Sequence, residues 1–193
     1  MAYIDLVEKD QAPPEVLAIY EDSEATRGFV METWKAIAHN PEIFAAYLGY
    51  IRAVFGPGDL DQRTKDLVAV RCSYLNQCQY SLSHRVDASR SQGIGDDDLE
   101  ALAEPTTDNF TAAELAALAF ATELTLGPQT IAYAANAQAV SAETLAAVKE
   151  HFSDAAISEL TITVALWNGL NRYHRVMDFE LDMPVPPGAL DVS

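Results

Sequence analysis

Apolar side chains recur along most of this 193-residue chain at the three- and four-residue spacing of one helix face. The clearest run begins at Pro41 and places the following residues on one side of a helix: Ile43, Phe44, Tyr47, Leu48, Ile51 and Phe55. Gly56-Pro57-Gly58 ends this helix with a strong turn signal. The alternation typical of strands is weak throughout, so the pattern predicts an all-α protein.

Capping and helix-breaking residues predict where the other helices lie. Thr111 with Glu114 three residues later forms a capping box, and we expect Gly127-Pro128 to end that helix. The alanine-rich stretch 130–139 is compatible with helix or loop. Further helices are expected to begin near these residues: Pro13, Met31, Asp61, Cys78, Asp96, Ser141 and Ser153. The helix that begins near Ser153 is the last and is expected to run to about Met177.

The chain is expected to form one domain over 1–193. Residues 1–60 supply N-terminal helices, 61–177 the core, and 178–193 an extended tail. The tail contains Pro184, Pro186 and Pro187, which disfavour a helix, and we expect it to be free to wrap another subunit.

The overall charge restricts the class of partner. Lys and Arg number 12 against 29 Asp and Glu, a net charge of -17, which disfavours binding to nucleic acid or to a membrane surface. The apolar stretch 160–170 is too short to span a membrane.

Two cysteines cannot build a disulfide framework, and the first residues lack the features of a signal peptide, so we expect a cytoplasmic protein with free thiols.

The acidity is uneven along the chain. Residues 63–90 hold five Lys or Arg against two Asp, a local charge of +3, whereas the rest of the chain carries -20. A cationic segment in an acidic protein is a candidate site for an anionic ligand. Alternatively, these cations pair with acidic residues elsewhere in the fold.

The same segment contains groups suited to proton transfer. A helix break at Asn76-Gln77 places Cys78 in the first turn of the next helix, where free amides and the helix dipole stabilise a thiolate. Ser81 follows three residues later, and His84 and Arg85 follow Ser81 by three and four residues. A thiol, a hydroxyl, an imidazole and a guanidinium are therefore expected along one edge of this helix.

Residues beside this edge complete the candidate site. Asp66, one helix earlier, is expected to act as a base or to orient His84, and Arg71 and Tyr80 are expected to bind substrate. Each residue also has a purely structural interpretation, in which the cysteine is a small buried apolar group and the charged groups are solvated or ion-paired. We interpret Cys72 as structural.

The last helix carries a polar stripe on an otherwise apolar pattern. Asn168, Asn171, His174 and Arg175 recur in helical register after Trp167. Polar residues in register on a buried helix usually face a cavity, an interface or water. Asn168, Asn171 and His174 are therefore further candidates for substrate binding.

The segment from Asp66 to Gly93 resembles the signature of the carboxymuconolactone decarboxylase and alkylhydroperoxidase AhpD-like superfamily. The matching residues are Asn76-Gln-Cys78-Gln-Tyr80-Ser81-Leu-Ser-His84 followed by Ala88-Ser-Arg-Ser-Gln-Gly93. Four more segments match in the expected order: 12–16, 40–42, 110–114 and 160–172. The resemblance implies an AhpD-like helical bundle, assembled as a homotrimer or hexamer.

Departures from the family pattern bear on function. The resemblance implies that the family's peroxidases use two cysteines with an upstream Glu and a His. Cys78 matches the first cysteine, but Ser81 stands at the second, so an internal disulfide cannot form. Asp66 stands at the Glu position, and Arg85 at the common His position, with His84 matching the His of some variants. A two-cysteine peroxidase cycle is therefore disfavoured.

Three functions remain open at this point. The first is a cofactor-free acid–base enzyme for a small anionic metabolite of lactone or carboxylate type, with Asp66, Cys78, Ser81 and His84 catalytic and Arg85 binding the anion. No residue spacing suggests a metal site. The second is a single-thiol peroxidase or redox sensor that uses Cys78. The third is a non-catalytic binding or assembly protein.

Overall fold

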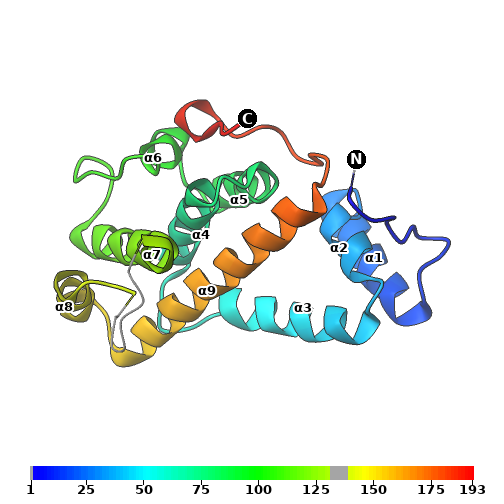
Figure 1. Cartoon of the computed structure of the whole chain (residues 1–193), viewed down its shortest axis with the longest axis horizontal. Helices are drawn as coiled ribbons and strands as arrows, with labels where there is room; N and C mark the ends of the chain where they lie inside the picture. The colour runs from blue at the N-terminus through cyan, green and yellow to red at the C-terminus, as the bar shows by residue number, and fades with distance from the viewer. Residues whose placement is uncertain (1, 131–138) are drawn as a thin grey trace.

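The computed structural model describes residues 2–130 and 139–193, and every regular element in them is helical (Figure 1). This confirms the all-α prediction. The elements are α1 (Pro14–Arg27), α2 (Glu32–Ile37), α3 (Pro41–Phe55), α4 (Gln62–Leu75), α5 (Gln79–Ser91), α6 (Asp96–Ala101), α7 (Ala112–Thr130), α8 (Ala142–His151), α9 (Asp154–Met177) and a 3-10 turn, η1 (Gly188–Leu190).

Helix α4 is the centre of the fold. It packs against α5, α7 and α9, so side chains on nearly its whole circumference are buried. These include the polar residues Lys65, Asp66 and Arg71, for which the surrounding helices must supply partners. Because α4 is covered on several sides, its sequence lacks the polar face of a surface helix.

The long helix α9 separates two groups of helices. In Figure 1 it runs diagonally, with α3 on one side and the α4–α5 pair on the other. Its buried residues Leu160, Val164 and Trp167 join the core formed with α4 and α7. Helices α1 to α3 form a smaller core of their own around Tyr20 and Phe44. The space between the two groups is where the candidate site lies.

Local capping explains most helix boundaries. Asp61 accepts a hydrogen bond from the Thr64 amide (2.9 Å), and the Glu114 carboxylate accepts one from the Thr111 amide (2.8 Å), as the capping box predicts. Two expectations were wrong in detail. Gly95, not Asp96, is the N-cap of α6, and α7 continues past Gly127-Pro128 to Thr130. Most of the ambiguous stretch 130–139 lies outside the described residues.

The C-terminal tail packs on its own chain. After α9 it crosses to α6, where Leu190 is fully buried beside Leu99 and Leu102 (Figure 1). At Gly188 a Cβ atom would lie 2.5 Å from a carboxylate oxygen of Glu100, so only glycine fits this docking point without a shift. Within a single chain the end of the tail is therefore docked on α6, and its expected contact with another subunit stays a prediction. No helix in the described part is long and apolar enough to cross a membrane.

Candidate active site

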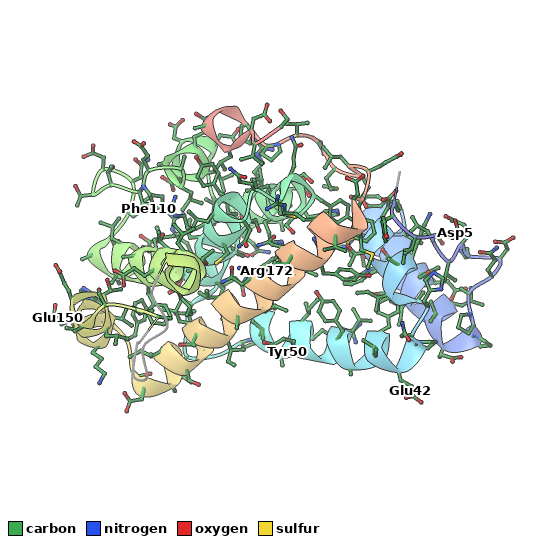
Figure 2. All side chains as sticks on the ribbon, in the orientation of Figure 1. Asp5, Glu42, Tyr50, Phe110, Glu150 and Arg172 are labelled. Atoms are coloured by element: carbon green, nitrogen blue, oxygen red, sulfur yellow. The ribbon has the colours of Figure 1, made fainter. Side chains whose placement is uncertain are left out.

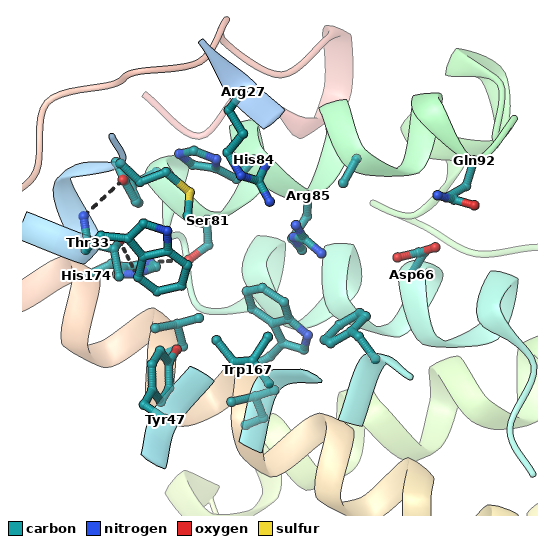
Figure 3. A pocket seen from close by; sticks show the side chains of 18 of the residues that line it. Arg27, Thr33, Tyr47, Asp66, Ser81, His84, Arg85, Gln92, Trp167 and His174 are labelled. Carbon is teal, nitrogen blue, oxygen red and sulfur yellow. Dashed lines mark hydrogen bonds between the residues drawn. The ribbon is translucent and has the colours of Figure 1, made fainter. Parts of the chain in front are cut away.

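A cavity of about 270 Å³ lies between the α4–α5 pair and helices α2, α3 and α9 (Figure 3). Its polar wall comes from α4 and α5 and comprises Gln62, Asp66, Tyr80, Ser81, His84, Arg85 and Gln92. The opposite wall is largely apolar and comprises Met31, Trp34, Tyr47, Ile51, Phe55, Leu166, Trp167 and Leu170. Of the residues predicted from the sequence, the structure brings Asp66, Tyr80, Ser81, His84, Arg85 and His174 to this cavity.

The break between α4 and α5 creates the polar wall. Gln77 adopts the left-handed conformation (φ 51°), and the Asn76 side-chain amide donates to the Cys72 carbonyl and to Asn168 Oδ1, both at 2.8 Å. This ends α4 and lets α5 start at Gln79. The residues spaced at three and four along α5 then face the cavity, as the sequence predicts.

Arg85 is the most unusual group in the cavity wall. Its guanidinium lies 4.9 Å from the ring centroid of Trp167 and 5.5 Å from that of Phe55. Within the described residues it forms no hydrogen bond or ion pair, and its buried Nε has no partner. Burial lowers the pKa of Arg85 to about 10, so the group stays charged at neutral pH. Cation–π contacts offset part of the cost of burying this charge.

Asp66 is a second buried charged group on this wall. It is 2% exposed and accepts a hydrogen bond from the Gln62 side-chain amide (3.1 Å). Burial raises the pKa of Asp66, although Gln62 and the positive charge of Arg85 act in the opposite direction. Asp66 does not bond to His84, so the interpretation in which it orients that imidazole is wrong. It remains a carboxylate suited to proton transfer.

The partner of His84 is Asp182, a tail residue that the sequence did not indicate. One Asp182 oxygen accepts a hydrogen bond from His84 Nε2, and the other accepts from the Tyr80 hydroxyl (2.9 Å) and the Glu32 amide (3.3 Å). Burial alone would raise the pKa of Asp182, but these hydrogen bonds, led by that of His84, hold it below its usual value. With Nε2 engaged, Nδ1 is the nitrogen of His84 that forms no hydrogen bond in the described part of the chain, which suits it to exchange a proton with a bound molecule.

A chain of hydrogen bonds connects Cys78 to the other side of the cavity. The Cys78 thiol donates to Ser81 Oγ (3.2 Å), Ser81 Oγ bonds to His174 Nδ1 (2.7 Å), and His174 Nε2 bonds to Thr33 Oγ1 (2.9 Å). Burial lowers the pKa of His174 to about 3, so its ring is neutral at pH 7. The network therefore links neutral groups.

Cys78 itself does not line the cavity. It is the N-cap of α5 and 2% exposed, and burial raises the pKa of its thiol despite the opposing hydrogen bonds from Ser81. The backbone amides of Ser81 and Tyr80 favour the thiolate as expected, but they do not produce the expected net stabilisation of it. Desolvation is the larger effect at this position.

Three predicted binding residues lie elsewhere. Arg71 donates to the carbonyls of Leu102 and Ala103, both at 2.8 Å, and so holds the end of α6 rather than a substrate. Asn168 bonds across helices to Asn76 and to Thr125 (3.0 Å). Asn171 is fully buried outside the cavity lining, and neither atom of its amide has a partner in the described part of the chain. His174 is the member of the polar stripe that reaches the cavity.

The cationic segment 63–90 is mostly neutralised by the fold. Arg63 pairs with Asp98 (2.8 Å) and Glu114 (2.7 Å), and the segment's other ion pairs are Lys65 with Glu159 and Arg90 with Asp96 (2.6 Å). Arg71 binds carbonyls. Arg85 is left as the cation of this segment that faces the cavity. Arg27 from α1 also lines the cavity, and its sequence context gave no signal for this role.

The carboxymuconolactone decarboxylase family model matches residues 41–123, which include α4, α5 and the polar wall of the cavity. This match covers less than half of the chain and contains the segment whose residues resemble the family signature. A curated relative is the uncharacterized protein 4 in the cox locus of Paracoccus denitrificans, 38% identical over 48 residues. That match spans 25% of this chain and 43%, less than half, of the relative.

Solved structures share the fold over nearly the whole chain. A peroxidase-related protein with an AhpD core from Ralstonia eutropha JMP134 superposes with a TM-score of 0.79 at 18% identity, covering 94% of this chain and 92% of that one. The debrominase Bmp8 superposes with a TM-score of 0.80 at 22% identity, and the match covers 98% of this chain and 97% of the debrominase chain. A cysteine-to-alanine variant of that debrominase has been solved in complex with 2,3,4-tribromopyrrole.

Proposed function

We propose that this protein is a cofactor-free acid–base enzyme, of the decarboxylase or isomerase kind, that acts on a small anionic organic metabolite in the cavity. The observation that carries the proposal is Arg85, a cavity-wall cation that forms no hydrogen bond or ion pair in the described structure and interacts with the Asp66 carboxylate only at a distance. Leaving such a charge unpaired is costly unless a ligand compensates it. A carboxylate is the ligand group that a guanidinium binds best, through two parallel hydrogen bonds.

Two groups that can move protons flank this anchor. His84, which bonds to Asp182, and Asp66 are these groups, and Figure 3 shows His84 and Asp66 on either side of Arg85. His84 is suited to take a proton from a carbon next to the bound carboxylate, while Asp66, whose pKa is raised, is suited to carry a proton at the other end. Groups held in different environments in this way commonly divide the roles of acid and base.

The site contains the residues for this chemistry without an added group. Among the described residues no cluster of three or more His, Cys, Asp or Glu is arranged to hold a metal ion. Cys78 is buried away from the cavity wall with a raised thiol pKa, which weighs against the single-thiol peroxidase. The superfamily contains enzymes, and the debrominase of the same fold is known in complex with a small ring compound.

We also propose that the chain self-associates in the cytoplasm, through α3 and α9. Exposed residues on α9 recur at alternating three- and four-residue spacing: Ala155, Ser158, Ile162, Ala165, Gly169, Arg172 and Val176. Neighbouring α3 exposes Ile43 (61%) and Tyr50 (40%), and both Tyr50 and Arg172 are labelled in Figure 2. This heptad-like stripe is small or apolar apart from Arg172, and such a stripe is typical of helix pairing between subunits.

Proton exchange in heavy water tests the enzymatic proposal. A panel of small unsaturated, keto and lactone carboxylates is followed by NMR for deuterium uptake and for release of carbon dioxide. For any member that the wild type turns over, His84→Asn and Arg85→Met should each lose at least about 100-fold in rate. The control His151→Asn, at the exposed end of α8, should retain full rate. Full turnover in both site variants would contradict the proposal, and absence of any reaction would favour a non-catalytic role.

A further inference from the structure

The aromatic wall of the cavity points to the chemical class of the molecule that the cavity holds. We propose, on the basis of the proposed function, that the anion bound at Arg85 is a single-ring aromatic carboxylate that bears a further oxygen on its ring. Three observations carry this: the volume of the cavity, its aromatic wall, and two buried donors on that wall that lack partners.

The volume sets the size of the ligand. A dry protein cavity of about 150 Å³ holds benzene, so a cavity of about 270 Å³ holds one ring with its substituents. A nucleotide or a coenzyme thioester does not fit in this space. Straight-chain acids of similar volume would fit, so size alone does not define the ring.

The shape of the opposite wall favours a flat ring. Trp34, Tyr47, Phe55 and Trp167 all line the cavity. Trp34 and Tyr47 meet edge to face with centroids 6.3 Å apart, and Phe55 and Trp167 do so at 5.7 Å. Rings set at these angles present both faces and edges, which an aromatic ligand engages by offset stacking or edge-to-face contact. A saturated ring of the same size would bury the same apolar surface in the cavity, but it would not make these aromatic contacts.

Two donors on the aromatic wall define the polar substituent. The Tyr47 hydroxyl and Trp167 Nε1 are buried and have no hydrogen-bond partner among the described residues. Burial raises the pKa of Tyr47, so its hydroxyl stays protonated and able to donate. The indole nitrogen of Trp167 is a donor only. An oxygen on the ligand ring would accept from these groups, whereas Arg85 takes the carboxylate.

Four probes of similar size separate the contributions of the charge, the aromatic ring and the ring oxygen. Calorimetric titration compares benzoate, 4-hydroxybenzoate, cyclohexanecarboxylate and the uncharged benzamide. For the wild type we expect benzoate to bind about fivefold more tightly than cyclohexanecarboxylate, as aromatic contacts predict. The ring oxygen should add about a further three- to tenfold.

A pair of tyrosine variants assigns the oxygen contact. Tyr47→Phe should remove the advantage of 4-hydroxybenzoate over benzoate, whereas Tyr3→Phe, at an exposed position in the N-terminal segment, should keep it. Circular dichroism verifies that both variants are folded. The comparison of the four probes on the wild-type protein tests the ligand class even if a variant does not fold.

The outcomes separate this inference from the function on which it rests. Equal binding of benzoate and cyclohexanecarboxylate would overturn the aromatic class and leave the anion site intact. Equal binding of benzoate and benzamide would overturn the anion site and with it the proposed function. Failure of every carboxylate to bind at millimolar concentration would overturn both.

Discussion

Replacing Asp182 by Asn should destabilise the protein by releasing the tail from the cavity wall. Asp182 is the acceptor for His84 Nε2, for the Tyr80 hydroxyl at 2.9 Å and for the Glu32 amide at 3.3 Å. Its side chain is 16% exposed, so solvent replaces these bonds only in part. A hydrogen bond to a charged group contributes about 1.5–3 kcal/mol, and an Asn amide has one acceptor oxygen where the carboxylate has two. We therefore expect a loss of about 2–3 kcal/mol in the free energy of unfolding.

The pH dependence of this loss identifies its cause. The pKa of Asp182 is lowered in the folded protein, so its contribution to stability is present above the unfolded-state pKa, about 4, and disappears as the pH falls through the lower folded-state value. Urea unfolding of wild type and Asp182→Asn between pH 7 and pH 3 should therefore show a difference that is full at pH 7 and shrinks in acid. Asp178→Asn is the matched control, because Asp178 is exposed in the same tail and adopts a left-handed conformation (φ 52°) that Asn tolerates well. Equal stability of Asp182→Asn and wild type at pH 7 would refute the reasoning.

Three further predictions concern the core, the thiol and assembly. Glu159→Gln leaves the ammonium of Lys65, which is 1% exposed, without its charged partner and should cost about 3–5 kcal/mol in urea unfolding, and an unchanged midpoint would argue against a stabilising pair. Cys78 should resist a thiol reagent at pH 8 in the native protein and react promptly in urea, whereas fast native reaction would show that the thiol is accessible. Ile162→Glu should shift the mass measured by light scattering to that of a monomer, and an unaltered assembly would place the interface elsewhere.

Features governed by neighbours in sequence were predictable. Pro41 starts a helix and the Thr111–Glu114 box caps one because these effects act within a single turn. The break at Asn76-Gln77 belongs to the same class. Because the break was predicted at this point, Ser81, His84 and Arg85 were expected on one edge of the helix that follows. In the structure that edge of α5 faces the cavity.

Features set by packing between distant segments were not predictable. Asp182 reaches His84 across 98 positions in sequence, and nothing in the composition of the tail indicates a buried carboxylate. Arg71 was expected to bind substrate because of its charge, but the carbonyls at the end of α6 lie within reach of its guanidinium. Which cation of a segment remains unpaired depends on where all the acidic residues lie in space.

Cys78 illustrates two opposing effects, of which the sequence shows one. A position at the start of a helix favours the thiolate, and this is visible in the residues around the helix break. Burial opposes it and depends on cover from distant residues, here Ala36 and Phe179 together with Tyr80. The structure shows that burial has the larger effect on the thiol pKa.

The central claim is that Arg85 is an anion-binding group on the cavity wall whose guanidinium accepts a bound ligand as its hydrogen-bonded partner. The most direct test combines urea unfolding and benzoate titration for wild type, Arg85→Met and Arg90→Met, the last a cation on the same helix that pairs with Asp96 outside the cavity. Urea unfolding without ligand verifies that each variant is folded, because removing Arg85 also takes a neighbouring positive charge from the buried carboxylate of Asp66. Arg85→Met should weaken benzoate binding by at least about tenfold, while Arg90→Met should bind as the wild type does. Wild-type benzoate affinity in Arg85→Met would contradict the claim.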